Sequence, residues 1–164
     1  MTMANLRLLT SRLVRTNTKE ISSLNIFLKI FLYLHMKIYI ITNARLGKQI
    51  FGIPCLLLLN IGAQSNIERK AVLVYLEEKD AYYIVASNGG SNSHPSWYYN
   101  LKKNPLAKVK IGKEVKSVEA EELTGDERTK YWVKLDNLNR GGYQNYQIRT
   151  HRQIPIFKLK ITWS

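Results

Sequence analysis

The sequence predicts a small antiparallel β-barrel with interspersed helices, preceded by a separate N-terminal extension. From about residue 50 onward, the apolar residues fall into six short runs separated by turn-forming residues, which is typical of strands. Two or three helical segments lie between these runs, without the regular strand–helix alternation of a doubly wound parallel sheet. The 164-residue chain is long enough for one such domain and an appendage. We therefore assign residues 1–48 to the extension and residues 49–164 to the barrel domain.

The N-terminal extension is apolar and basic. Residues 26–41 read IFLKIFLYLHMKIYII, an apolar run interrupted by Lys29, His35 and Lys37. A membrane-spanning helix needs roughly 20 apolar residues, and the small-residue cleavage site of a signal peptide does not follow this run. Cations on an apolar helix are typical of helices that lie on anionic lipid. We expect a helical extension at the inner face of the cell membrane; the alternative is a helix packed over one end of the barrel.

The charge of the chain indicates an acidic partner. Lys and Arg number 25 against 12 Asp and Glu, which gives a formal net charge of +13. Anionic lipid, nucleic acid or a polyanionic ligand would each suit this excess. The basic residues are spread over several segments without a nucleic-acid-binding motif, so we expect no nucleic acid partner. Cys55 is the single cysteine and the Cys/His spacing fits no metal site, so we expect a reducing cytoplasmic setting and no metal.

The first strands of the barrel domain follow from local signals. Residues 53–61 (IPCLLLLNI) form a continuous apolar run, which predicts a buried strand. A polar loop over residues 62–70 follows. Residues 71–76 and 81–87 are closely spaced apolar runs, which predicts an antiparallel hairpin.

The middle of the chain predicts a helix and a second hairpin. The turn-forming run 88–93 precedes Pro95, which suits the first turn of a helix, and Asn104-Pro105 ends this helix. Residues 106–111 alternate apolar and basic side chains, and residues 115–121 return after a tight turn. This pattern predicts two antiparallel strands with one face in water.

The last part of the chain predicts one more helix and one more strand. Residues 124–127 (TGDE) have the pattern of a capping box, and their acids complement the helix dipole. The helix extends to the break at residues 137–142. A short tyrosine-rich piece over residues 143–149 leads into a strand over residues 154–161.

The segment 85–100 (VASNGGSNSHPSWYYN) carries the main functional signal. A strand ends in two glycines beside a helix start, where consecutive backbone N–H groups can bind an anion. Trp97 and Asn100 lie one helical turn apart on one face. These features suit a phosphorylated cofactor that carries a ring. The alternative is a glycine turn that leads into a core-packing helix.

Three stretches form a specific pattern: ASNGGSNSHPSWYYNLKKNPLAKVKIGKE, ELTGDERTKYW and GGYQNYQIRTHRQIPIFKL. With them the chain resembles the deazaflavin-dependent nitroreductase family over roughly residues 39–159. The resemblance implies a split β-barrel of the FMN-binding type. It also implies an oxidoreductase that uses reduced coenzyme F-420, an 8-hydroxy-5-deazaflavin, to reduce a quinone, a nitro compound or a similar acceptor. Several members of this family are membrane-associated.

The same resemblance implies which residues form the site. It assigns cofactor binding to Gln64, Ser65, Arg69, Lys70, Val72, Ser87, Asn88, Gly89, Trp97 and Asn100. It assigns catalytic roles to three tyrosines. Tyr143 and Tyr146 match tyrosines that close over the acceptor, and the strand pattern predicts that Tyr75 faces the same cavity. The alternative for the tyrosines is rim packing with the hydroxyl in water.

The loop over residues 62–69 departs from the family pattern G-R-x-S-G-x-x-R and reads GAQSNIER. Ala63 and Gln64 replace basic residues, and each lost charge-assisted contact to an anionic cofactor is worth about 1.5–3 kcal/mol. Asn66 replaces a glycine, and asparagine tolerates the left-handed conformation, so the turn can survive. The alternatives that remain are an FMN-dependent oxidoreductase of the same fold and a non-catalytic membrane-surface binding protein. A homodimer is compatible with the sequence.

Overall fold

The computed structural model describes most of the chain from residue 26 onward: residues 26–27, 30–31, 33–42, 46, 49–50 and 52–162. The chain divides into two compact units, Met1–His35 and Met36–Ser164. The second unit contains the barrel and also the helical residues 36–41, which the sequence analysis assigned to the extension. The part of the extension before residue 26, together with Lys29 and the predicted boundary at residue 48, lies outside the described residues.

The segment 26–41 is helical at every described position. Most of its large apolar side chains are exposed: Ile26, Phe27, Ile30, Phe31, Tyr33, Leu34, Ile38 and Ile41. Tyr39 is different, because it is buried and packs with Leu57 of the barrel domain. Within the described part of the chain, no helix has both the length and the apolar character that crossing a bilayer requires.

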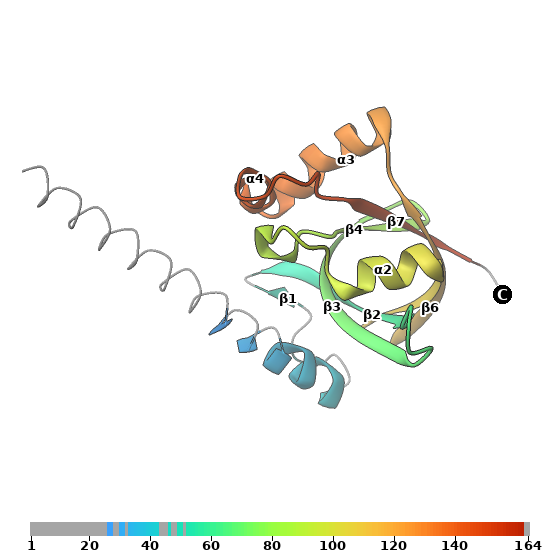
Figure 1. Cartoon of the computed structure of the whole chain (residues 1–164). Coiled ribbons are helices and arrows are strands. Elements are labelled where there is room, and N and C mark those ends of the chain that lie inside the picture. The colour runs from blue at the N-terminus through green and yellow to red at the C-terminus, as the bar shows by residue number, and fades with distance from the viewer. Residues whose placement is uncertain are drawn as a thin grey trace, which may run out of the picture. The chain divides into compact units, whose positions relative to one another are not determined.

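Six antiparallel strands form a closed barrel (Figure 1). They are β2 (Ile53–Ile61), β3 (Glu68–Glu78), β4 (Ala81–Val85), β5 (Leu106–Ile111), β6 (Glu114–Glu122) and β7 (Ile156–Ile161). The strand order is β2-β3-β4-β7-β6-β5, and β5 pairs with β2 to close the barrel. A short strand, β1 (Gln49–Ile50), adds to the edge of β2. The predicted split barrel with about six strands is confirmed.

Strand β4 is buried on both faces, which explains its continuous apolar sequence. Tyr82 and Ile84 belong to the cluster inside the barrel. Ala81, Tyr83 and Val85 belong to a second cluster outside the barrel, under the C-terminal helices. Alternate side chains of a strand point to opposite faces, so one strand contributes to both cores.

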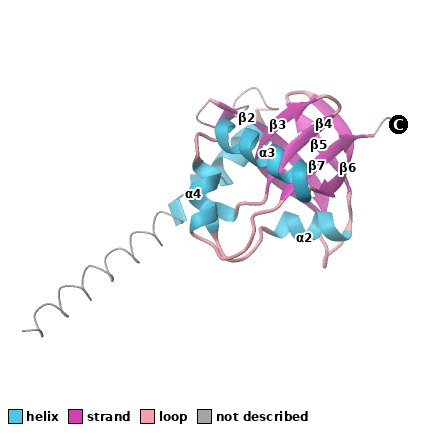
Figure 2. Ribbon diagram, turned by 90° about the horizontal axis from the view of Figure 1, so that it is seen from above, coloured by secondary structure: helices cyan, strands magenta, loops and turns pink. Residues whose placement is uncertain are grey.

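Helices pack against the barrel (Figure 2). Helix α2 (Ser96–Lys103) packs Trp97 and Leu101 into the barrel core, where the Trp97 ring meets Phe157 edge-on at 5.9 Å between centroids. Helices α3 (Gly125–Leu138) and α4 (Gly142–Ile148) lie on the side of β4 and β7 (Figure 1). A single 3-10 turn, η1 (Asn88–Gly90), connects β4 to the segment before α2.

Strands β3 and β7 begin at least two residues away from their predicted starts, for identifiable reasons. Strand β3 begins at Glu68, inside the predicted loop, because β2 extends to Ile61 and the two residues pair. Strand β7 begins at Ile156 and not at Ile154. Pro155 lies between them and has no N–H to donate to a ladder.

The C-terminal helices differ from the sequence analysis in two details. Residues 142–148 form the helix α4, which starts after Gly141 at φ +79°, whereas the sequence analysis placed a break at residues 137–142 and assigned no helix to the tyrosine-rich residues 143–149. Thr124 is the N-cap of α3, as expected, but among the described residues its side chain accepts no capping hydrogen bond. The acids Asp126 and Glu127 do lie in the first turn, where they complement the helix dipole.

Candidate functional site

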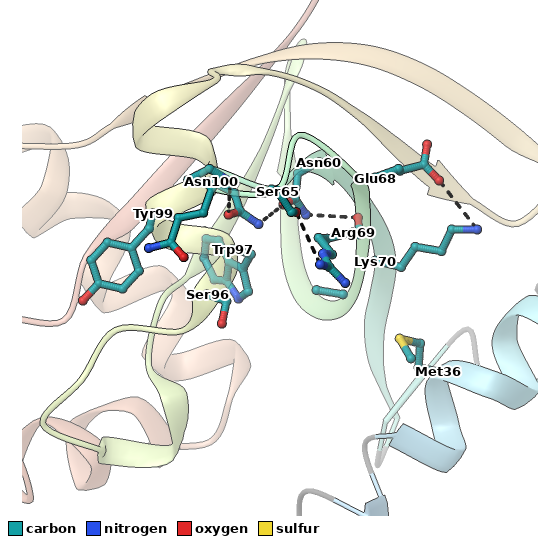
Figure 3. Close-up of a pocket in the computed structure, with 14 residues that line it drawn as sticks. Met36, Asn60, Ser65, Glu68, Arg69, Lys70, Ser96, Trp97, Tyr99 and Asn100 are labelled. Carbon is teal, nitrogen blue, oxygen red and sulfur yellow. Dashed lines mark hydrogen bonds and ion pairs between the residues drawn. The ribbon is translucent and has the colours of Figure 1, made fainter.

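A cavity of about 840 Å³ lies between the loop after β2 and helix α2 (Figure 3). Its lining includes six of the predicted cofactor-binding residues: Gln64, Ser65, Arg69, Lys70, Trp97 and Asn100. Met36, from the helical segment before β1, also lines it. Residues from sequence positions more than 60 apart thus form one cavity.

A buried amide network fixes helix α2 to the loop. Asn100 donates from Nδ2 to Asn60 Oδ1 at 2.6 Å, and its Oδ1 accepts from the Ala63 N–H at 2.9 Å. Asn60 in turn donates from Nδ2 to the carbonyl of Arg69 at 3.3 Å. Both asparagines are buried, so these bonds satisfy groups that burial would otherwise leave unpaired. Sequence reasoning missed Asn60, although a polar residue in the apolar run IPCLLLLNI was a usable signal.

The loop over residues 62–67 is held at its tip and closed by its own backbone. Lys103 Nζ donates to the Ala63 carbonyl at 2.6 Å, and the Gly62 N–H donates to the Ile67 carbonyl at 2.9 Å. Asn66 has φ +53°, so the left-handed conformation expected for it is confirmed. An added Cβ at Gly62 would lie 3.3 Å from the Ile67 carbonyl oxygen, which is a tight contact, and 2.5 Å from the Ser65 hydroxyl oxygen, which would have to rotate away.

Cations lie on one wall of the cavity. Arg69 donates from Nη2 to Ser65 Oγ at 3.3 Å. Lys70 Nζ lies 3.7 Å from Glu68 Oε1, and both side chains are about half exposed (Figure 3). An exposed ion pair of this kind is worth little, so Lys70 can exchange Glu68 for an anionic ligand. The wall therefore offers positive charge, partly countered by one carboxylate.

The predicted residues Ser87, Asn88 and Gly89 lie in and before η1, which the described lining of this cavity does not include. Asn88, Gly89 and Gly90 have φ values of +48°, +63° and +80°. Gly90 packs against helix α4, because an added Cβ would lie 2.9 Å from the Tyr146 carbonyl oxygen. This turn is therefore next to the tyrosine-bearing helix.

The three predicted catalytic tyrosines lie in two places, neither on the described wall of this cavity. Tyr143 and Tyr146 are on α4, with ring centroids 6.4 Å apart. Tyr143 is almost fully buried, which raises its pKa above the ordinary value. Tyr75 lies inside the barrel, edge-on to Tyr82 at 5.5 Å, because odd-numbered β3 residues face the core. Burial raises the pKa of Tyr75 to about 12.

Val72 also lies away from the described lining of the cavity, on the outer face of β3. It packs against the cluster of Tyr39 and Leu57. The cavity thus unites the loop and α2 residues of the predicted site, and it leaves out Val72, the η1 residues and the tyrosines. The roles assigned to all of these side chains stay predictions.

Comparison with known proteins gives concordant matches. The family model described as F420H(2)-dependent quinone reductase matches residues 32–160. An F420H(2)-dependent quinone reductase of Mycobacterium tuberculosis (strain H37Rv) is 40% identical over 131 residues, which cover 78% of this chain and 88% of that protein. A putative F420H(2)-dependent quinone reductase of Mycobacterium bovis matches to the same extent.

Two solved structures are also similar. One, described as an F420-H2 dependent reductase, superposes with a TM-score of 0.60 at 39% identity, covering 65% of this chain and 94% of that chain. Another, described as a domain-swapped dimer, superposes with a TM-score of 0.61 at 39% identity, covering 65% and 80%.

Proposed function

Since the chain belongs to the F420H(2)-dependent quinone reductase family, we propose that it is an oxidoreductase that transfers a hydride from reduced coenzyme F-420 to a quinone. The observation that carries the proposal is the family match over residues 32–160, which includes both walls of the cavity. A nitro compound is a second acceptor class, because it also takes up a hydride and a proton.

The residues around the cavity fit a phosphorylated deazaflavin with an acidic tail. The volume lies within the range of roughly 300–1,000 Å³ that is common for ligand pockets. Arg69 and Lys70 would bind phosphate or carboxylate oxygens by charge-assisted hydrogen bonds. Ser65 would add a hydroxyl, and Trp97 and Asn100 would contribute an aromatic surface and a fixed amide. The donor set is thus that of a site for an anionic ligand that carries a ring.

Bound reduced coenzyme F-420 supplies the hydride, so the protein must position the reactants, exclude water and provide a proton. Asn100 and Lys103 position the loop that carries Ser65, through their bonds to the Ala63 backbone. Tyr143 and Tyr146 would hydrogen-bond the acceptor oxygen and deliver the proton to it. A tyrosine hydroxyl is protonated at neutral pH even at its ordinary pKa of about 10, and burial raises the pKa of Tyr143 further, so this hydroxyl remains a hydrogen-bond donor.

Binding is tested by fluorescence titration of the full chain with reduced coenzyme F-420, oxidised coenzyme F-420 and FMN. We expect saturable binding of coenzyme F-420, weakened about tenfold or more by Arg69→Gln, because one charge-assisted contact is worth about 1.5–3 kcal/mol. Lys113→Gln is the control, because it removes one exposed positive charge in the turn between β5 and β6. Saturable binding of FMN alone would contradict the proposal and favour the FMN-dependent alternative.

Turnover is tested by Tyr143→Phe and Tyr146→Phe. Each change removes one hydroxyl and keeps the ring, so we expect kcat for quinone reduction to fall about tenfold to a hundredfold while coenzyme affinity stays nearly constant. Equal losses of kcat and of coenzyme affinity would contradict the proposal that these tyrosines act in turnover and not in coenzyme binding. Tyr75→Phe tests the third tyrosine in the same assay.

We also propose that the segment 26–41 places the enzyme on an anionic membrane at its cytoplasmic face. Two observations support this: the exposed apolar side chains of the segment and the net charge of +13. We expect the chain to cosediment with anionic phospholipid vesicles more than with zwitterionic ones. The double variant Ile38→Glu, Ile41→Glu should lose this binding, and Lys113→Gln should retain it. Equal binding by the double variant would argue against the lipid contact.

A homodimer is a further proposal about this enzyme. Its support is that a similar solved chain is described as a domain-swapped dimer. Sedimentation velocity over a range of protein concentrations tests it, and a single monomeric species at all concentrations would contradict it.

A further inference from the structure

Among the described residues, the guanidinium of Arg152 makes four hydrogen-bond contacts, and the functional assignment leaves this side chain without a role. It lies between α4 and β7, and it contacts the segment that links β4 to α2, about 60 residues earlier in the chain. Nε donates to the Ser91 carbonyl at 2.9 Å. Nη2 donates to the carbonyls of Ala86 at 3.0 Å and Ser87 at 2.9 Å. One planar fork thus holds three backbone carbonyls of a single turn.

The fourth contact of this guanidinium is to a histidine. Arg152 Nη1 lies 3.1 Å from His94 Nδ1. Because a guanidinium can only donate, His94 Nδ1 accepts, and the neutral ring carries its proton on Nε2. His94 also stacks on Tyr98 of α2, with ring centroids 4.0 Å apart. Arg152 therefore links the η1 turn to the start of α2.

Arg152 is itself held in place by helix α4. Gln147 Nε2 donates to the Arg152 carbonyl at 2.8 Å, and Gln147 Oε1 accepts from the Ile154 N–H at 2.9 Å. The Thr150 hydroxyl donates to Asn92 Oδ1 at 3.0 Å, which adds a second connection to the same loop. The anchor is therefore fixed by the element that carries Tyr143 and Tyr146.

The turn that Arg152 holds is conformationally costly. Asn88, Gly89 and Gly90 have three consecutive positive φ values, and a non-glycine residue in this region costs free energy. The Ser87 carbonyl accepts from the Gly90 N–H at 3.0 Å as well as from Arg152, so the anchor and the turn share an atom. The guanidinium bonds offset the cost of this backbone shape.

We propose that Arg152 is a positioning residue, which holds the 86–91 segment in its functional shape. The inference rests on the proposed function in one respect: it takes the coenzyme to contact Ser87, Asn88 and Gly89, as the family resemblance implies. Arg152 acts through this turn and does not itself touch the reacting atoms.

The test uses the full chain and the variants Arg152→Gln and Arg152→Lys, with Lys113→Gln as the control for loss of a positive charge. In both Arg152 variants we expect the amides of Gly90 and Ser91 to exchange hydrogen at least tenfold faster by NMR or mass spectrometry. We expect coenzyme F-420 to bind at least tenfold more weakly, while kcat at saturating coenzyme changes less than threefold. Lysine keeps the charge but lacks the fork, so Arg152→Lys remains informative if Arg152→Gln does not fold.

The NMR titration of His94 gives a readout that general destabilisation would not produce. Burial lowers the His94 pKa and Arg152 lowers it further, whereas Glu122 opposes them. Arg152→Gln should therefore raise this pKa, and Arg152→Lys should raise it less. Unchanged exchange of Gly90 and Ser91, or a fall in kcat as large as the loss of affinity, would overturn the positioning role. If the unmodified chain does not bind coenzyme F-420, the proposed function fails, and so does the part of this inference that concerns the coenzyme. The hydrogen exchange of Gly90 and Ser91 and the pKa of His94 still decide whether Arg152 orders the turn.

Discussion

Two turns follow strands of the barrel and carry predicted cofactor-binding residues, but the protein holds them by different means. The turn over residues 62–67 is held by two side chains of α2, Asn100 and Lys103, which contact the backbone of Ala63. The turn over residues 87–90 is held by close backbone packing against α4 and by the guanidinium of Arg152.

Because the two turns are held differently, they tolerate different substitutions. Any residue except proline presents the same N–H and carbonyl at position 63 to α2, so the replacement of a basic residue by Ala63 leaves the anchoring intact. Asn66 replaces a glycine and adopts φ +53°, so the turn itself survives as well. The second turn places the Cα of Gly90 against the α4 backbone, where a side chain has no space. The first turn is therefore the variable one.

The largest expected effect tests the backbone contact of the second turn. Gly90→Ala would bring a Cβ to 2.9 Å from the Tyr146 carbonyl oxygen, at φ +80°. Gly89→Ala is the matched control, because its φ is +63° but its Cβ would meet open space. We expect the free energy of unfolding to fall by about 3 kcal/mol for Gly90→Ala and by about 1 kcal/mol for Gly89→Ala. Urea unfolding followed by circular dichroism measures both, and equal losses would show that the contact with α4 is unimportant.

The second prediction concerns the side-chain anchor of the first turn. Asn100→Ala leaves the buried Asn60 Oδ1 and the Ala63 N–H without their partner, so we expect a loss of about 2 kcal/mol in the free energy of unfolding. Asn145→Ala, an exposed change on α4, should cost less than about 0.5 kcal/mol. The same urea experiment applies. A loss for Asn100→Ala as small as that of the control would mean that the amide network does not stabilise the turn.

Much of the barrel could be predicted because its signals are local. The run IPCLLLLNI gave β2 at its observed limits, and the alternating residues 106–111 gave β5. Helix α4 could not be predicted in this way, because its sequence GYQNYQI has weak helix propensity and itself begins with a glycine, directly after Gly141. Its stability comes from packing on α3 and on η1, which local patterns do not reveal.

The candidate site was likewise predicted only in part. The family resemblance predicted side chains that line the cavity, such as Arg69 and Trp97, because they belong to continuous motifs. The residues that hold these motifs in place escaped prediction, since their partners are distant in sequence. Asn60 bonds a residue 40 positions away, and Arg152 bonds one 66 positions away. Neither distance is encoded in a local pattern.

The third prediction sharpens the claim that the first turn is variable. Asn66→Gly restores a residue without a Cβ at φ +53°, so we expect the free energy of unfolding to change by less than about 0.5 kcal/mol. Asn66→Ala places a less tolerant residue at the same φ, and we expect a loss of about 1 kcal/mol. A loss of several kcal/mol for Asn66→Gly would contradict the view that the turn is held mainly through the Ala63 backbone.

The smallest expected effect is a pH dependence of the free energy of unfolding, which we expect from the second turn and not from the first. Burial and the neighbouring Arg152 lower the pKa of His94 in the folded state, below the unfolded value of about 6.5. The unfolded chain therefore binds a proton first as the pH falls, so His94 costs stability below about pH 6.5 and has no effect well above it. His94→Gln should remove this part of the pH dependence, whereas Asn66→Gly should keep it. Urea unfolding of the three proteins at about pH 7.5 and about pH 5.5 measures the difference. If the His94→Gln variant loses more stability on acidification than the unmodified chain, the contact between Arg152 and His94 does not govern the titration.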